Sequence, residues 1–164
     1  MFETISLWLH GTQAGKLLLT FFISVLPVIE LRGGLPAGVA IGLPIPAAFL
    51  ASLIGNMLPV PFVILFARPL FKWIRTHIPA LSGLVTKLEE RAHAKSKNVK
   101  KYEAWGLLLF VAVPLPGTGA WTGALIAALL DMRLRRAVPV ILAGVVTAGI
   151  IVSLITVGAF GVFA

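Results

Sequence analysis

The 164-residue sequence contains no cysteine, which excludes disulfide bonds, thiolate metal sites and cysteine nucleophiles. It also contains few charged residues: 12% of the chain is charged and 59% is hydrophobic, against about 25% and about 45–50% in an ordinary soluble domain. A chain of this composition cannot cover its surface with polar side chains in water, so a soluble enzyme and a disordered tail are both excluded. The length allows one compact unit, and four membrane-embedded segments of roughly 20 residues fill most of it.

Acidic residues are scarce, and the basic residues are clustered. The formal net charge is +8, and nine of the fourteen Lys and Arg residues lie in the stretch 68–103, which holds only three acidic residues. Because this stretch lies between apolar segments, the positive-inside rule assigns it to the cytoplasm. The same reasoning argues against nucleic acid as a partner. Apolar residues at helical spacing from Leu81 to Ala92 predict a basic amphipathic helix on the inner leaflet or, equally, a solvated helix packed on the protein.

Two apolar stretches carry no charge and are long enough to cross a membrane. They predict crossing helices at 45–67 and 137–160. Apolar residues between Phe2 and Leu9 predict a shorter interfacial helix at the outer surface. The start of the chain lacks the basic residues of a cleaved signal peptide, so we expect the membrane segments to belong to the mature protein.

Two other apolar stretches are interrupted in the middle. The stretch 17–43 carries Glu30 and Arg32, and the stretch 104–130 holds a Pro/Gly-rich run at 114–119. Proline removes a backbone donor and glycine permits chain reversal. Each stretch is therefore either a kinked crossing helix or a re-entrant hairpin that enters and leaves on one side.

The distribution of charge favours re-entrant hairpins. If 104–130 crossed the membrane, the arginines of 131–136 would lie opposite the basic segment 68–103, against the positive-inside bias. A hairpin there places both basic segments in the cytoplasm, and a hairpin at 17–43 follows by the same logic. The predicted fold class is all-α integral membrane, an inverted repeat of a re-entrant helical hairpin plus a transmembrane helix, with amphipathic interfacial helices. Its first half covers 1–67 and its second half covers 104–164.

The first candidate site lies in the hairpin 17–43. Ionisable side chains inside the membrane cost free energy unless they are paired with another charge or are in contact with water. They are therefore functional candidates by default. Residues i and i+2 of a regular helix do not face each other, so we expect a backbone break at the hairpin tip, beside Gly33, Gly34 and Pro36, to bring Glu30 and Arg32 to one cavity. Arg32 offers forked donors for phosphate or carboxylate, and Glu30 can exchange a proton. Alternatively, the two charges only neutralise each other to hold the tip.

The second candidate site is the Pro/Gly run and the helix predicted to follow it. A half-helix that begins inside the membrane presents unpaired N–H groups to an anion, and hydroxyl groups and an indole lie beside them. Alternatively, this run is a turn that needs glycine for close packing. The residues are Pro114, Pro116, Gly117, Thr118, Gly119, Trp121 and Thr122.

Asn56 is a polar amide inside the first predicted crossing helix. It either lines the same cavity or forms a hydrogen bond between helices. The motifs of zinc proteases and serine hydrolases are absent, and the histidines are scattered outside the apolar segments. We therefore expect no enzyme, no metal site and no cofactor.

Three motifs occur in a fixed order: ELRGGLP at 30–36, GNMLPVP at 55–61 and PLPGTGAWTG at 114–123. With them, the chain from about Leu17 to Phe160 resembles the bacterial and archaeal small multidrug export protein family. It is more distantly similar to the DedA/VTT superfamily, whose members have paired re-entrant hairpins and include lipid scramblases and polyprenyl phosphate translocases. The resemblance implies a phosphate-bearing lipid near Arg32 and the Gly117–Gly119 turn, with Glu30 as a proton-linked partner.

We therefore expect a multi-pass transporter of the cell membrane that moves an amphiphilic, anionic or lipid-like substrate, with possible proton coupling at Glu30. Its partners are membrane lipids and the substrate. We also expect a homodimer, because two full crossings do not enclose a pathway. One alternative is a multidrug exporter of cationic compounds with Glu30 as the counter-charge. Another is a membrane scaffold or assembly factor that transports nothing.

Overall fold

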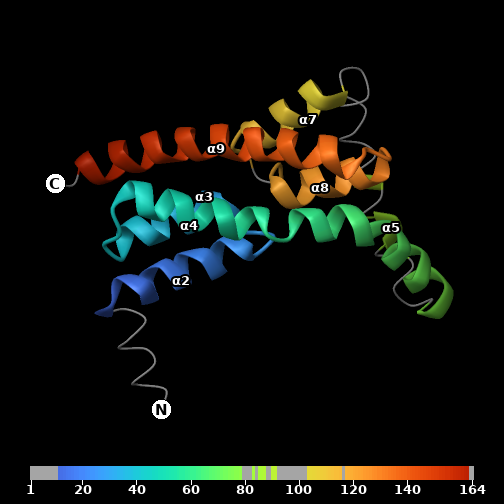
Figure 1. Ribbon diagram of the computed structural model, residues 1–164, viewed down its shortest axis with the longest axis horizontal. Helices are drawn as coiled ribbons and strands as arrows, with labels where there is room; N and C mark the ends of the chain where they lie inside the picture. Colours follow the sequence, from blue (N-terminus) through green and yellow to red (C-terminus); the bar gives the residue numbers. More distant parts are fainter. Residues whose placement is uncertain are drawn as a thin grey trace, which may run out of the picture. The chain divides into compact units, whose positions relative to one another are not determined.

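The computed structural model describes residues 11–78, 83, 85–87, 90–91, 103–115 and 117–162, which form helices and the turns between them and contain no strand. The expected outer helix at 2–9 and half of the amphipathic segment from Leu81 to Ala92 lie outside these residues. Figure 1 labels the main helices. They are α2 (Gln13–Val25), α3 (Glu30–Ala40), α4 (Ile45–Met57), α5 (Val60–His77), α7 (Glu103–Ala112), α8 (Ala120–Leu129) and α9 (Leu134–Val162).

Two helical segments are long and apolar enough to cross a membrane. They are Ile45–Ile74, which runs through α4 and α5, and Leu134–Ala159 in α9. These segments agree with the two crossing helices expected from the sequence. The first ends at Ile74 and not at the expected residue 67, because α5 remains helical as far as His77.

The other four helices are too short to cross. α2 has 13 residues, α3 has 11, and α7 and α8 have 10 each. At 1.5 Å per residue these helices are about 15–20 Å long, against about 30 Å for the hydrocarbon core of a bilayer. Residues 26–29 join α2 to α3, and residues 113–119 join α7 to α8. The partners in each pair pack on each other, so each pair is a short helical hairpin.

The chain packs as two units. Unit 1 comprises Met1–Leu58 and Val145–Ala164, and unit 2 comprises Pro59–Gly144. In unit 1, α2, α3 and α4 pack on one another (Figure 1). Their close approach depends on small residues at the contacts. A Cβ added at Gly38 in α3 would lie 2.7 Å from Thr20 Oγ1 of α2 and 3.1 Å from Ala48 Cβ of α4.

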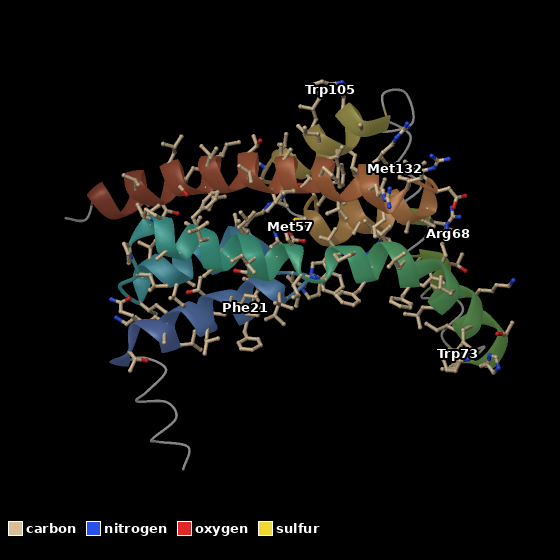
Figure 2. All side chains as sticks on the ribbon, in the orientation of Figure 1. Phe21, Met57, Arg68, Trp73, Trp105 and Met132 are labelled. Atoms are coloured by element: carbon tan, nitrogen blue, oxygen red, sulfur yellow. The ribbon has the colours of Figure 1, made fainter. Side chains whose placement is uncertain are left out.

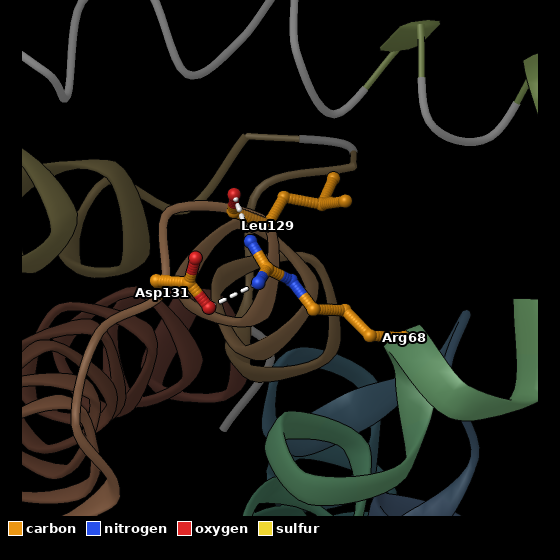
Figure 3. Close-up of polar contacts among 3 residues, drawn as sticks. All are labelled: Arg68, Leu129 and Asp131. Carbon is orange, nitrogen blue, oxygen red and sulfur yellow. Dashed lines mark hydrogen bonds and ion pairs between the residues drawn. The ribbon is translucent and has the colours of Figure 1, made fainter. Parts of the chain in front are cut away.

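In unit 2, α8 packs against both α5 and α7. Arg68 of α5 forms an ion pair with Asp131 and donates a second hydrogen bond, of 2.6 Å, from Nη2 to the carbonyl of Leu129 (Figure 3). Asp131 follows α8 with a left-handed backbone, φ 56°. The exposed ion pair itself contributes little to stability. The guanidinium also satisfies a carbonyl at the C-terminus of α8, where a cation is favoured.

Candidate functional site

Glu30 and Arg32 lie at the start of α3, next to the turn that joins it to α2. Glu30 has a left-handed backbone, φ 52°, and its side chain is buried, with 6% of the residue exposed. Its amide donates a 2.9 Å hydrogen bond to the carbonyl of Leu26, which closes the turn. Arg32 is half-buried, and the Glu30 carboxylate attracts its guanidinium. The two charges therefore interact, although residues i and i+2 of a regular helix do not face each other.

The expected backbone break at Gly33, Gly34 and Pro36 is wrong, because these residues lie inside α3. The two glycines serve close packing. A Cβ added at Gly34 would lie 1.8 Å from Ser24 Oγ of α2, and one at Gly33 would lie 2.3 Å from Ile29 Cγ2. Pro36 supplies no N–H to the carbonyl four residues earlier, that of Arg32. The chain reversal instead occurs in the turn 26–29, just before Glu30.

Unit 1 has a polar interior. Among the described residues, every buried polar or charged side chain belongs to this unit, and the set is Thr20, Ser24, Glu30, Ser52, Asn56 and Thr156. Ser24 lies where three helices meet, since it faces Gly34 of α3 and Gly55 of α4. The last turn of α4 is therefore level with the first half of α3, which carries Glu30 and Arg32.

Asn56 is buried in α4, and so is Ser52 one turn earlier. In the described part of the chain, Asn56 Oδ1 and Ser52 Oγ have no hydrogen-bond partner. The sequence analysis singled out Asn56 but not Ser52. Its spacing of four residues from Asn56 could have identified Ser52, because residues i and i+4 share one face of a helix.

The residues of the second candidate site belong to unit 2. The hydroxyl of Thr118 lies 2.8 Å from the carbonyls of Val113 and Leu115 and accepts a hydrogen bond from the amide of Leu115 at 3.3 Å. Gly117 takes a left-handed backbone, φ 75°, which closes the turn. Because the Thr118 hydroxyl forms its hydrogen bonds within the turn, these contacts favour a structural role for Thr118 over a role in binding a substrate.

The helix after this turn begins as the sequence predicts. α8 starts at Ala120, no side chain caps it, and its preceding residue Gly119 is buried. Pro114, Trp121 and Thr122 are half-buried, and Pro116 lies outside the described residues. The structure thus gathers Glu30, Arg32 and Asn56 in unit 1, and it gathers the residues of 114–122 in unit 2. No cluster of three or more His, Cys, Asp or Glu side chains that could hold a metal occurs among the residues it describes.

Comparison with known proteins gives one match. The family described as "Putative small multi-drug export protein" matches residues 30–151, from the buried Glu30 to the interior of α9. No curated protein and no solved structure matches the chain significantly. The description is that of a transport protein rather than an enzyme, and together with the two long apolar helices it supports a membrane location. Because the match covers most of the chain and confirms the resemblance seen in its motifs, the chain belongs to the small multi-drug export protein family.

Proposed function

We propose that the protein is an integral membrane transporter that moves an amphiphilic anionic substrate of the lipid-phosphate kind, with Arg32 as the group that receives the anion. The observation that carries this proposal is the unequal burial of the two charges in α3: Glu30 is buried, whereas Arg32 is only partly buried. The charge within reach of a substrate is therefore the cation. A guanidinium binds phosphate and carboxylate through paired, charge-assisted hydrogen bonds.

The lengths of the short helices support a re-entrant arrangement. Each helix of the two hairpins reaches about half-way through a bilayer. The turn between α2 and α3 carries an apolar residue, Val28, of which 92% is exposed, and the turn after α7 carries Leu115, of which 56% is exposed. Exposed apolar tips suit a lipid environment. We place residues 68–103 and 131–136 in the cytoplasm, and the two halves of the chain then have opposite topology.

Glu30 has a separate role in the proposal. A buried carboxylate next to a fixed cation is a group that can gain and lose a proton as the site changes its access to water. Glu30 would thus couple transport to a proton gradient. We also propose that the protein works as a homodimer in the cell membrane, because two crossing segments per chain enclose no pathway alone.

The family description favours a competing function, the export of cationic drugs with Glu30 as the counter-charge. Flux assays with purified protein in proteoliposomes separate the two. We expect labelled polyprenyl phosphate to move at least about tenfold faster than in empty liposomes, and a cationic dye to move no faster. The Glu30→Gln variant should lose any dependence on a pH gradient while it keeps the anion flux. Dye flux without phosphate flux would establish the competing function, and no flux of either would support a membrane scaffold.

A further inference from the structure

The end of α4 carries two buried oxygen atoms whose hydrogen-bonding capacity the described part of the protein does not use. Ser52 is fully buried and Asn56 is 2% exposed, yet Ser52 Oγ and Asn56 Oδ1 have no hydrogen-bond partner among the described residues. One helical turn separates the two residues, so both lie on one face of α4. Burial of a polar group without a partner is unfavourable. The pair therefore needs an explanation beyond packing.

Other hydroxyl groups in unit 1 form a hydrogen bond to their own helix that Ser52 does not form. Thr20, Ser24, Ser153 and Thr156 each donate to the carbonyl four residues earlier in their own helix, at 2.7–2.8 Å. Ser52 has the same option in the middle of a regular helix but does not take it. Its oxygen thus stays available to a ligand, and Ser52 shares one face of α4 with Asn56.

The backbone at the end of α4 offers carbonyl oxygens that lack their usual helical donors. Pro59 and Pro61 have no N–H, so the carbonyls of Gly55 and Met57 lose the donors that a continuous helix would give them. Met57, labelled in Figure 2, is the last residue of α4. The end of a helix with unused carbonyls carries partial negative charge and attracts cations. Interrupted helices in transporters coordinate small cations in this way.

We infer that the last turn of α4 binds a monovalent metal cation through Ser52 Oγ and Asn56 Oδ1. Both unused side-chain atoms are oxygens, which are the ligands that hard cations prefer. Both of these oxygens are neutral, whereas sites for divalent hard cations depend on carboxylates. Neutral hydroxyl, amide and carbonyl oxygens suit a monovalent ion, as carbonyl oxygens do in potassium channels. The inference concerns binding and holds whichever substrate the protein moves.

Thermal unfolding of the purified protein tests this inference. The full chain in detergent is titrated with sodium chloride or potassium chloride, with choline chloride replacing the salt to keep the ionic strength constant, and tryptophan fluorescence reports unfolding. One of the two metal ions should raise the Tm saturably, by about 3–6 °C at ten times its Kd. Choline should leave the Tm unchanged.

Three variants assign the effect to the site. Ser52→Ala and Asn56→Leu each remove one oxygen and should lose the cation-dependent rise in Tm. Ser153→Ala is the matched control, because its hydroxyl is bonded to its own helix, and it should keep the rise. Equilibrium dialysis with radioactive sodium supplies a second readout if Asn56→Leu folds poorly. The inference is wrong if neither metal ion raises the Tm, or if both site variants retain the rise. A bound water would then be the hydrogen-bond partner of the two oxygens.

Discussion

Replacement of Gly55 by leucine should unfold unit 1 or prevent its assembly. A Cβ at this position would lie 2.4 Å from the carbonyl oxygen of Phe21 and 3.1 Å from its carbonyl carbon. Both are backbone atoms of α2 (Phe21 is labelled in Figure 2), so no side-chain rotation can relieve the clash. α2 would have to move away from α4, and Ser24 would lose its close approach to Gly55. We expect a cost of about 3 kcal/mol or more in the free energy of unfolding.

A second glycine provides the control for this substitution. Gly158 lies in the part of α9 that belongs to unit 1, and no described atom outside its own helix backbone lies within 4 Å of a Cβ built there. Gly158→Leu should therefore unfold at a temperature no lower than that of the unmodified protein. Circular dichroism during heating in detergent measures both variants. If Gly55→Leu is as stable as Gly158→Leu, the packing of α2 on α4 described above is incorrect.

Replacement of Arg32 by glutamine should reduce the flux of an anionic lipid by about 30–100-fold, which corresponds to a loss of about 2–3 kcal/mol for a charge-assisted contact. The substitution removes the accessible positive charge but keeps a polar side chain of similar length. Initial rates of polyprenyl phosphate flux in proteoliposomes measure the loss. Unchanged flux in a correctly folded Arg32→Gln protein would show that this residue does not bind the anion.

This substitution also leaves Glu30 buried without its cation, which could itself destabilise the fold. The double variant Glu30→Gln, Arg32→Gln separates the two effects. It removes both charges, so it should recover the stability of the unmodified protein while anion flux stays low. Recovery of flux in the double variant would show that Arg32 serves only to neutralise Glu30.

The sequence predicts the long helices better than it predicts the site. The crossing helices follow from uncharged apolar runs, and the start of α8 follows from the Pro/Gly pattern before it. In contrast, the residue types of Gly33, Gly34 and Pro36 predict a break in the helical backbone that the structure does not have. Their helical state depends on how closely α3 approaches Ser24, which is a tertiary contact. A local pattern cannot distinguish a glycine that turns the chain from one that admits a neighbouring helix.

Two features of the site also depend on the folded chain. The left-handed backbone of Glu30 is unusual for a residue other than glycine, and it arises from the closed turn with Leu26. The unused oxygen of Ser52 depends on the orientation of its side chain, since Thr20 and Ser24 bond to their own helix. The sequence identified Asn56 as a polar residue at depth but could not show that its oxygen lacks a partner.

We propose that the first hairpin is re-entrant and that its turn, residues 26–29, lies near the middle of the membrane. The absence of cysteine allows a spin label to be attached at one introduced cysteine. Electron paramagnetic resonance in liposomes then compares collisions with oxygen, which is enriched in lipid, and with a water-soluble nickel chelate. Label at Val28→Cys should collide mainly with oxygen, and label at Gln13→Cys, at the start of α2, mainly with nickel. A label at position 28 that is as accessible to nickel as one at position 13 would contradict the account.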